Sequence, residues 1–176
     1  MYIGGFDLAM INVTLPDGTV NEYAAGITCA EVITDALGKK NGCLAALVDG
    51  QEKDMSHEIH QSCKVEGIKA ESDAGMYILR HSTAHLLAQA VTELYPDAKP
   101  TIGPAIDRGF YYDFAMEPIT EADLKPIPKK MQALARRNFT VERIELDDSE
   151  LREHFATNPY KLEIIDDKIG EGTGST

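Results

Sequence analysis

Two histidines four residues apart are the first candidates for chemistry in this chain of 176 residues. His81 and His85 lie in the segment RHSTAHLLAQAV, and positions i and i+4 share one face of a helix. Two imidazoles on one face can hold one metal ion or act as acid and base on one substrate. Ser82 follows His81, so the segment does not carry the HExxH motif of a metalloprotease. Two structural histidines, hydrogen-bonded where two domains meet, are the alternative interpretation.

A second group of possible metal ligands occurs earlier, in SHEIHQSC. His57, His60 and Cys63 are spaced by three residues, but a structural zinc site needs four ligands and no fourth is evident. This pattern favours a solvated turn over a zinc site. His154 lies on a segment with amphipathic helical periodicity and is most simply a surface residue.

Aromatic residues are concentrated in the segment IGPAIDRGFYYDF. On an extended strand, Phe110, Tyr112 and Phe114 share one face, and Tyr111 and Asp113 share the other. One face can simply belong to a hydrophobic core. A tyrosine hydroxyl can instead orient a ribose or a carbonyl, and a nucleobase can stack on an aromatic ring. The segment alone leaves both interpretations open.

A basic cluster stands out because the chain as a whole is acidic. Seventeen Lys and Arg residues against 29 Asp and Glu residues give a formal net charge of −12, which excludes nucleic-acid binding by overall charge. The cluster consists of Lys125, Lys129, Lys130, Arg136 and Arg137. It fits either a solvated helix face or a local contact with an RNA backbone.

The first 70 residues predict a small mixed β module. Alternating apolar residues at 11–15 and a strand at 20–23 flank the turn Pro16-Asp17-Gly18. Thr28 and Glu31 form a capping box for a helix that ends at Gly38. Apolar runs at 44–48 and 64–68 predict two more strands. This order of elements is that of a β-grasp, ubiquitin-like fold.

A polar hinge at 69–73 separates this module from a long helix that carries both histidines. Ser72 or Asp73 caps the helix, which runs to about Tyr95, ahead of Pro96. The next patterns predict strands at 100–106 and 109–114 around an Asp107-Arg108 turn. A capping pair, Thr120 and Asp123, then precedes a helix that begins at about Pro128. The remaining patterns predict a strand at 141–146, a helix at 148–155 capped by Asp148, and a last element at 159–165.

Composition excludes several classes of protein. No apolar run approaches the 18 residues of a membrane span, and the start MYIGGFDLA lacks the features of a signal peptide. Cys29, Cys43 and Cys63 form no CxxC pair, which favours buried free thiols in a reducing compartment. We therefore expect a cytoplasmic protein that makes no membrane contact.

Four segments together resemble the N-terminal region of the threonyl-tRNA synthetase family: MINVTLPDGTVNEYAAGITCAEV, RHSTAHLLAQAV, IGPAIDRGFYYDF and NPYKLEII. The likeness covers roughly residues 10–170. It implies an α+β protein with a TGS domain of β-grasp fold at 10–70, followed at 71–170 by an incomplete α+β editing domain of the threonyl/alanyl-tRNA synthetase type. That editing domain hydrolyses serine wrongly attached to threonine tRNA. A second, hydrolytic site is needed because binding discriminates one methyl group by only about 1–3 kcal/mol.

The resemblance also implies roles for individual residues. His81 and His85 match the first histidine pair of the editing pocket and are expected to be catalytic. Tyr112 matches a substrate-binding tyrosine that holds the terminal adenosine or the seryl group. Lys161, in NPYK, matches a lysine that positions or activates water. The implied chemistry is ester hydrolysis at the 3′ end of the tRNA.

The family further implies a threonine–tRNA ligase that uses ATP, a homodimer in its full-length form, and the acceptor end of threonine tRNA as partner. A later family segment, DLCRGPH, supplies a second cysteine and histidine, and the chain stops before it. We therefore expect a truncated fragment or an interrupted reading frame without ligase activity. No cofactor is expected for the fragment, and ATP, magnesium and zinc would serve only the absent catalytic core. A free-standing aminoacyl-tRNA deacylase acting in trans and a noncatalytic TGS interaction module are the alternatives.

Overall fold

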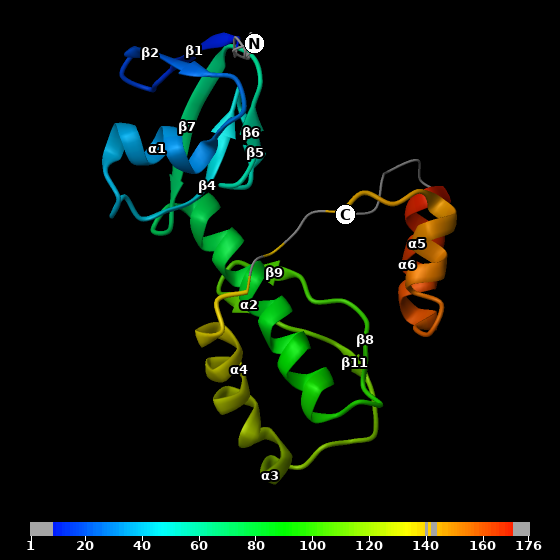
Figure 1. Cartoon of the computed structure of the whole chain (residues 1–176). Helices are drawn as coiled ribbons and strands as arrows, with labels where there is room; N and C mark the ends of the chain where they lie inside the picture. The colour runs from blue at the N-terminus through cyan, green and yellow to red at the C-terminus, as the bar shows by residue number, and fades with distance from the viewer. Residues whose placement is uncertain (1–8, 140, 142–143, 171–176) are drawn as a thin grey trace, which may run out of the picture. The chain divides into compact units, whose positions relative to one another are not determined.

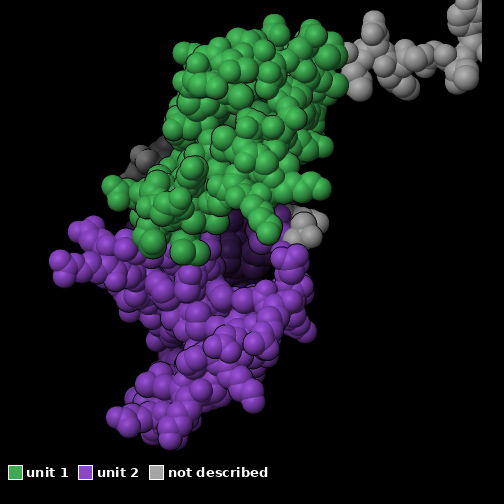
Figure 2. All heavy atoms as spheres, turned by 90° about the vertical axis from the view of Figure 1, so that its left-hand side faces the viewer, with its two compact units in different colours: residues 1–79 green, residues 80–176 purple. Residues whose placement is uncertain are grey.

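The computed structural model describes residues 9–139, 141 and 144–170 of the chain (Figure 1). It divides into two compact units, residues 1–79 and residues 80–176, which Figure 2 distinguishes by colour. The glycine-rich tail and most of MYIGGFDLA lie outside the described residues.

The first unit is built on a five-stranded sheet with the order β2-β1-β7-β4-β5. Its strands are β1 (Met10–Thr14), β2 (Val20–Ala24), β4 (Cys43–Val48), β5 (Gln51–Lys53) and β7 (Cys63–Lys69). Strands β1 and β7 pair in parallel, and the other neighbours pair antiparallel. A two-stranded ladder joins β3 (Ile27–Thr28) to β6 (Glu58–Ile59). These elements confirm the predicted hairpin, the two later strands and the α+β class.

Helix α1 (Cys29–Leu37) completes this unit because its apolar face shares a core with the sheet. Val32 and Ile33 are buried in one cluster with Val13 of β1 and Val65 of β7. The predicted capping box is confirmed, since the Thr28 backbone N–H donates to the Glu31 carboxylate at 2.9 Å. The helix ends at Gly38, whose φ of 84° is readily adopted only by glycine.

Helix α2 (Asp73–Leu94) begins in the first unit and continues into the second. The Ser72 hydroxyl accepts a hydrogen bond from the Gly75 N–H at 3.0 Å, so Ser72 is the N-cap. In the second unit, Ala90 and Val91 are buried in one cluster with Ile127 and Leu134 of a later helix. This packing fixes the rotation of the helix about its own axis.

A hairpin follows α2, but it is divided into two short ladders. The outer ladder pairs β8 (Lys99–Pro100) with β11 (Phe114–Ala115), and the inner ladder pairs β9 (Ala105–Ile106) with β10 (Gly109–Phe110). The strands predicted at 100–106 and 109–114 are therefore in the correct part of the chain, but each was predicted too long. Pro104 has no N–H to donate at the gap between the ladders.

The last four helices are α3 (Glu121–Leu124), α4 (Pro126–Arg136), α5 (Asp148–His154) and α6 (Pro159–Gly170). Helix α4 begins at Pro126 rather than near Pro128, because prolines are tolerated in the first helical turn, where a backbone N–H would have no intrahelical acceptor. The cap of α5 is Asp147 rather than Asp148, since its carboxylate accepts from the Ser149 N–H at 2.8 Å.

The strand predicted at 141–146 is wrong for its described residues. Val141 and residues 144–146 belong to no strand, and Val141 is 89% exposed. Alternation alone does not make a strand, because the ladder needs a hydrogen-bonding partner. Residues 142–143 lie outside the described residues.

The hairpin depends on a glycine where the Tyr112 ring packs against its backbone. A Cβ atom added at Gly103 would lie 2.1 Å from Cδ2 of Tyr112. The same ring stacks on Phe114, with centroids 4.9 Å apart and planes at 27°. Gly103 and Phe114 therefore both pack against the Tyr112 ring.

We expect Gly103→Ala to destabilise the second unit by about 1–3 kcal/mol, because overpacking forces the Tyr112 ring to move. The matched control is Gly109→Ala in the same hairpin, where an added Cβ meets nothing within 4 Å. Differential scanning calorimetry of both variants measures the effect. Equal melting temperatures for the two variants would contradict this role of Gly103.

Candidate active site

The two histidines of α2 lie in direct contact. Nε2 of His85 is 3.0 Å from Nε2 of His81, and the rings meet edge-on with centroids 4.6 Å apart. The predicted shared helix face is therefore confirmed. At this distance one nitrogen donates and the other accepts, so the two facing nitrogens cannot both carry protons. The pair favours a state with at least one unprotonated imidazole nitrogen.

The pKa of His85 is lowered from its ordinary value. Partial desolvation is the largest cause, and the neighbouring His81 and Lys161 add electrostatic repulsion of a protonated ring. A lowered pKa keeps His85 neutral at neutral pH, which is the form required of a general base. Lys161 thus lies close enough to His85 to influence its charge, although 76 residues separate them in sequence.

Lys161 lies in the first turn of α6 and is half-buried. Burial lowers the pKa of its ammonium group. The histidine pair comes from α2 and the lysine from α6, and the lysine lies near enough to His85 to disfavour its protonation.

Asn158 positions the start of α6, and sequence reasoning missed it. It is buried, and its Nδ2 donates to the Pro100 carbonyl of β8 at 2.8 Å. Its Oδ1 accepts from the Lys161 N–H at 3.3 Å, so Asn158 also caps the helix. The signal was present in the sequence as an asparagine directly before a proline, the usual pairing of an N-cap with the first helical position.

Tyr112 lies on the half-buried face of the hairpin. Phe110, Tyr112 and Phe114 are all partly buried, whereas Tyr111 and Asp113 are exposed, which confirms the predicted alternation. Burial raises the pKa of the Tyr112 hydroxyl, so the group stays protonated and can donate a hydrogen bond. Tyr112 packs against Gly103 and Phe114, and its role toward a substrate remains a prediction.

The earlier group of possible ligands is dispersed. Nε2 of His60 lies 3.2 Å from the Glu58 carboxylate on the surface, and Cys63 is buried in the core of the first unit. Within residues 9–139, 141 and 144–170, no three His, Cys, Asp or Glu side chains are grouped so that they could hold a metal ion. His154 contacts Phe155 edge-on, with ring centroids 4.9 Å apart.

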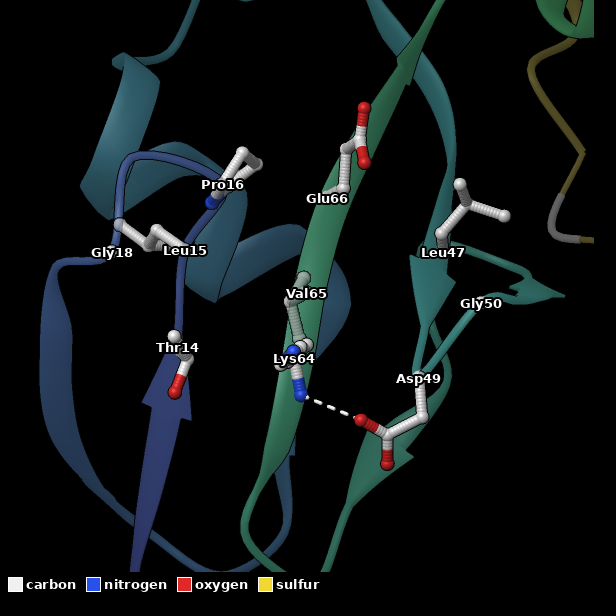
Figure 3. A pocket seen from close by; sticks show the side chains of 10 residues that line it. All are labelled: Thr14, Leu15, Pro16, Gly18, Leu47, Asp49, Gly50, Lys64, Val65 and Glu66. Atoms are coloured by element: carbon white, nitrogen blue, oxygen red, sulfur yellow. Dashed lines mark hydrogen bonds between the residues drawn. The ribbon is translucent and has the colours of Figure 1, made fainter.

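The first unit contains a cavity of about 570 Å³ that sequence reasoning did not anticipate (Figure 3). It is formed by the β1–β2 turn, the β4–β5 turn and the first half of β7. The Asp49 carboxylate accepts from the Lys64 N–H at 2.8 Å, which joins the β4–β5 turn to β7. None of the predicted catalytic residues lines this cavity.

No helix in the described part of the chain combines the length and the apolar character needed to cross a membrane.

Comparison with known proteins defines the first unit. Residues 11–69 match the TGS domain family, in agreement with the β-grasp order of strands and helix. The chain is also 46% identical to the threonine–tRNA ligase of Alkalilimnicola ehrlichii over 160 residues, and 44% identical to that of Francisella tularensis subsp. tularensis over 163 residues. These matches cover 88% and 89% of this chain and 25% of each relative.

The first unit is thus similar to TGS domains, and the second unit is also built of helices and short strands. The sequence of the chain corresponds to the N-terminal region of threonyl-tRNA synthetases, which confirms the resemblance carried by the motifs. The chain spans about a quarter of the length of the relatives it matches.

We expect Lys161→Met to raise the pKa of His85, because removal of a neighbouring positive charge makes protonation of the ring easier. The measurement is an NMR titration of the His85 ring resonances. Lys39→Met, which removes an exposed charge from the first unit, is the matched control and should leave the His85 titration unchanged. A His85 pKa that is the same with and without Lys161 would contradict the placement of the ammonium group near the ring.

Proposed function

We propose that the second unit is the editing part of a threonine–tRNA ligase and hydrolyses serine mischarged onto threonine tRNA. His81, His85 and Lys161 are the catalytic residues in this proposal, and Tyr112 binds the substrate. The identity of 44–46% to threonine–tRNA ligases supports the family of the enzyme. The observation that carries the hydrolytic role is the contact between the two imidazoles, with a lysine near enough to lower the pKa of one of them.

The reaction requires a water molecule to attack the ester carbonyl of the seryl group. A neutral imidazole accepts one proton of that water as the new C–O bond forms, which is general base catalysis. The negative charge that develops on the carbonyl oxygen is stabilised by a nearby cation, a role that suits the Lys161 ammonium group. When the ester C–O bond breaks, the protonated imidazole returns the proton to the 3′ oxygen of the ribose. The products are free serine and uncharged tRNA.

Two imidazoles in contact suit this proton transfer. Because only one of the facing nitrogens carries a proton, His81 can hold His85 in one tautomer while the other ring nitrogen remains available. Tyr112 fits the binding role because its ring packs against Gly103 and Phe114 and its hydroxyl stays protonated. A fixed donor of this kind can orient either the terminal ribose or the seryl group.

The wider activity of the relatives extends the proposal beyond this chain. Aminoacylation with ATP, with its magnesium and zinc requirements, belongs in this view to the three quarters of the relatives that this chain does not span. We place the full enzyme in the cytoplasm as a homodimer, with the acceptor end of threonine tRNA as the partner of the editing unit. We propose no cofactor for the hydrolytic step itself.

Serine release from seryl-tRNA specific for threonine tests the function directly. We expect His81→Ala and His85→Ala to reduce release by about 10²-fold or more, the usual loss of a general base. His60→Ala is the control, because His60 is an exposed histidine of the first unit. Threonyl-tRNA serves as the control substrate, and calorimetry verifies that each variant folds.

A second readout does not depend on turnover. Seryl-3′-aminoadenosine replaces the ester by an amide that resists hydrolysis, and its binding should shift the NMR resonances of His85 and Tyr112. Release that is equal in the parent chain and both histidine variants, together with no shift on titration with the amide, would contradict the editing role. It would favour the noncatalytic TGS module, with the cavity of the first unit as a candidate binding site.

A further inference from the structure

Helix α4 carries a concentration of positive charge that the proposed hydrolysis does not use. Residues 125–137 contain five Lys and Arg residues and no Asp or Glu, in a chain with 29 acidic residues. Chance placement of charges on a solvated helix would mix the two signs. The exclusion of acidic residues therefore needs an explanation.

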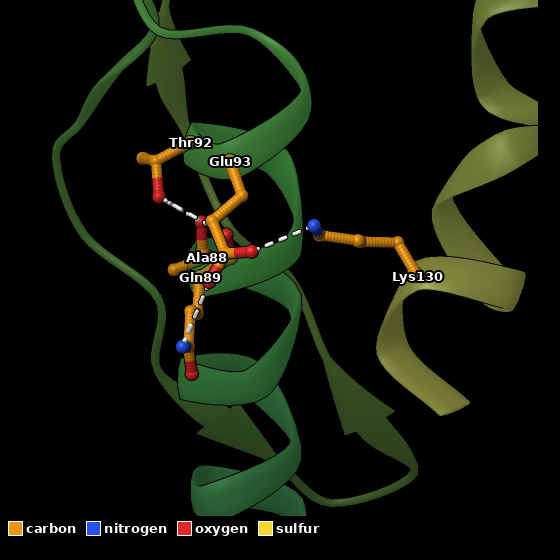
Figure 4. Close-up of polar contacts among 5 residues, drawn as sticks. All are labelled: Ala88, Gln89, Thr92, Glu93 and Lys130. Carbon is orange, nitrogen blue, oxygen red and sulfur yellow. Dashed lines mark hydrogen bonds and ion pairs between the residues drawn. The ribbon is translucent and has the colours of Figure 1, made fainter. Parts of the chain in front are cut away.

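The buried face of α4 accounts for one of the five charges. Ile127 and Leu134 are buried in the cluster shared with α2. Lys130 lies beside this face, and its Nζ is 2.7 Å from the Glu93 carboxylate of α2 (Figure 4). Gln89 also donates to that carboxylate at 3.0 Å, and these contacts together lower the pKa of Glu93. Lys130 is thus part of the packing between the two helices.

The other side of α4 presents its cations to solvent. At 3.6 residues per turn, Lys129 and Arg136 lie about 180–200° around the helix from Ile127. Lys125 has helical backbone angles and precedes Lys129 by four residues, so it continues the same line. All three are exposed, and no carboxylate among the described residues pairs with them. At a rise of 1.5 Å per residue they span about 16 Å, roughly five nucleotides at 3.4 Å each.

An exposed aromatic ring lies at the end of this basic line. Phe139 is 56% exposed, and the Arg137 guanidinium lies 5.1 Å from the centre of its ring. A solvent-facing ring of this kind offers a surface on which an unpaired base can stack. Basic side chains followed by a stacking ring are typical of sites for single-stranded nucleic acid.

We infer that the basic face of α4, defined as Lys125, Lys129 and Arg136, binds the phosphate backbone of RNA, and that Phe139 stacks an unpaired base beside it. The inference rests on the proposed function, since it names the surface that holds the RNA whose ester the histidine pair hydrolyses. A lipid surface fits less well, because α4 itself presents no large apolar side chain on its outward face and only the flanking Leu124 and Phe139 could insert.

The first test measures binding without any hydrolysis. A labelled, uncharged RNA hairpin with an unpaired 3′ end is titrated with the full chain, and fluorescence anisotropy is recorded at several salt concentrations. We expect Lys129→Gln/Arg136→Gln to weaken binding at least tenfold at low salt. The slope of log K against log salt should fall by about 1.4–1.8, as expected for two lost phosphate contacts. The control Lys39→Gln/Lys40→Gln makes the same change of net charge on an exposed part of the first unit and should bind like the parent.

The stacking contribution is tested with a second pair of RNAs. We expect Phe139→Ala to weaken binding of the hairpin with an unpaired 3′ end by about 5-fold or more, the lower limit for one stacked base. Binding of a blunt duplex should not change. Equal effects on both RNAs would overturn the stacking role of Phe139.

Several outcomes separate this inference from the proposed function. Serine release that is equal in the parent and both histidine variants, together with RNA binding lost in the Lys129/Arg136 variant, would contradict the proposed function and support this inference. RNA binding that is equal in the parent, the Lys129/Arg136 variant and the Lys39/Lys40 variant would overturn the inference, even if serine release were confirmed. Binding to vesicles of anionic phospholipid is measured with the same variants. If the Lys129/Arg136 variant lost vesicle binding but kept RNA binding, the inference would be overturned in favour of a membrane surface.

Discussion

Ala90 and Val91 of α2 pack with Ile127 and Leu134 of α4, and this contact determines which side of α2 faces solvent. Each residue turns the helix by about 100°, so burial of one stripe fixes the direction of every other side chain. Ala84 is fully buried, and His85 is the next residue in the sequence. The histidine pair therefore lies at the edge of the buried side of α2. At a border an imidazole is partly desolvated yet still reachable by substrate. That is the environment in which the pKa of His85 is lowered.

The site also needs a contact that joins distant parts of the chain. Asn158 satisfies the Pro100 carbonyl with one atom of its side chain amide and caps α6 with the other. A buried amide whose donor and acceptor are both hydrogen-bonded is stable. Loss of either hydrogen bond would leave a buried polar group without a partner. Through this residue the hairpin fixes the start of α6, and α6 presents Lys161 near His85.

Local chemistry in the sequence was sufficient to predict much of this arrangement. The capping box of Thr28 and Glu31, the alternation from Phe110 to Phe114 and the shared face of His81 and His85 each depend on a few neighbouring residues. The errors have equally local causes. The start of α4 was placed too late because prolines are tolerated in a first helical turn. The hairpin strands were predicted too long because a proline between the two ladders has no N–H to donate. The position of Lys161 near His85 and the cavity of the first unit depend on contacts between segments far apart in sequence. Periodicity and capping patterns carry no information about such contacts, and only the family resemblance singled out Lys161 as a candidate.

Charge is distributed in a way that links the two proposed activities. The chain is strongly acidic, so it repels RNA at a distance and favours contact only where cations are exposed without acidic neighbours. The basic face of α4 meets that condition, whereas Lys130 is held by Glu93. Lys161 differs from both, because burial lowers the pKa of its ammonium group and its charge acts on His85. In the proposed hydrolysis, a positive charge near His85 keeps that imidazole neutral before the reaction and attracts the negative charge that forms on an ester oxygen during it. In that proposal the same cation favours both the base form of the histidine and the transition state of ester hydrolysis.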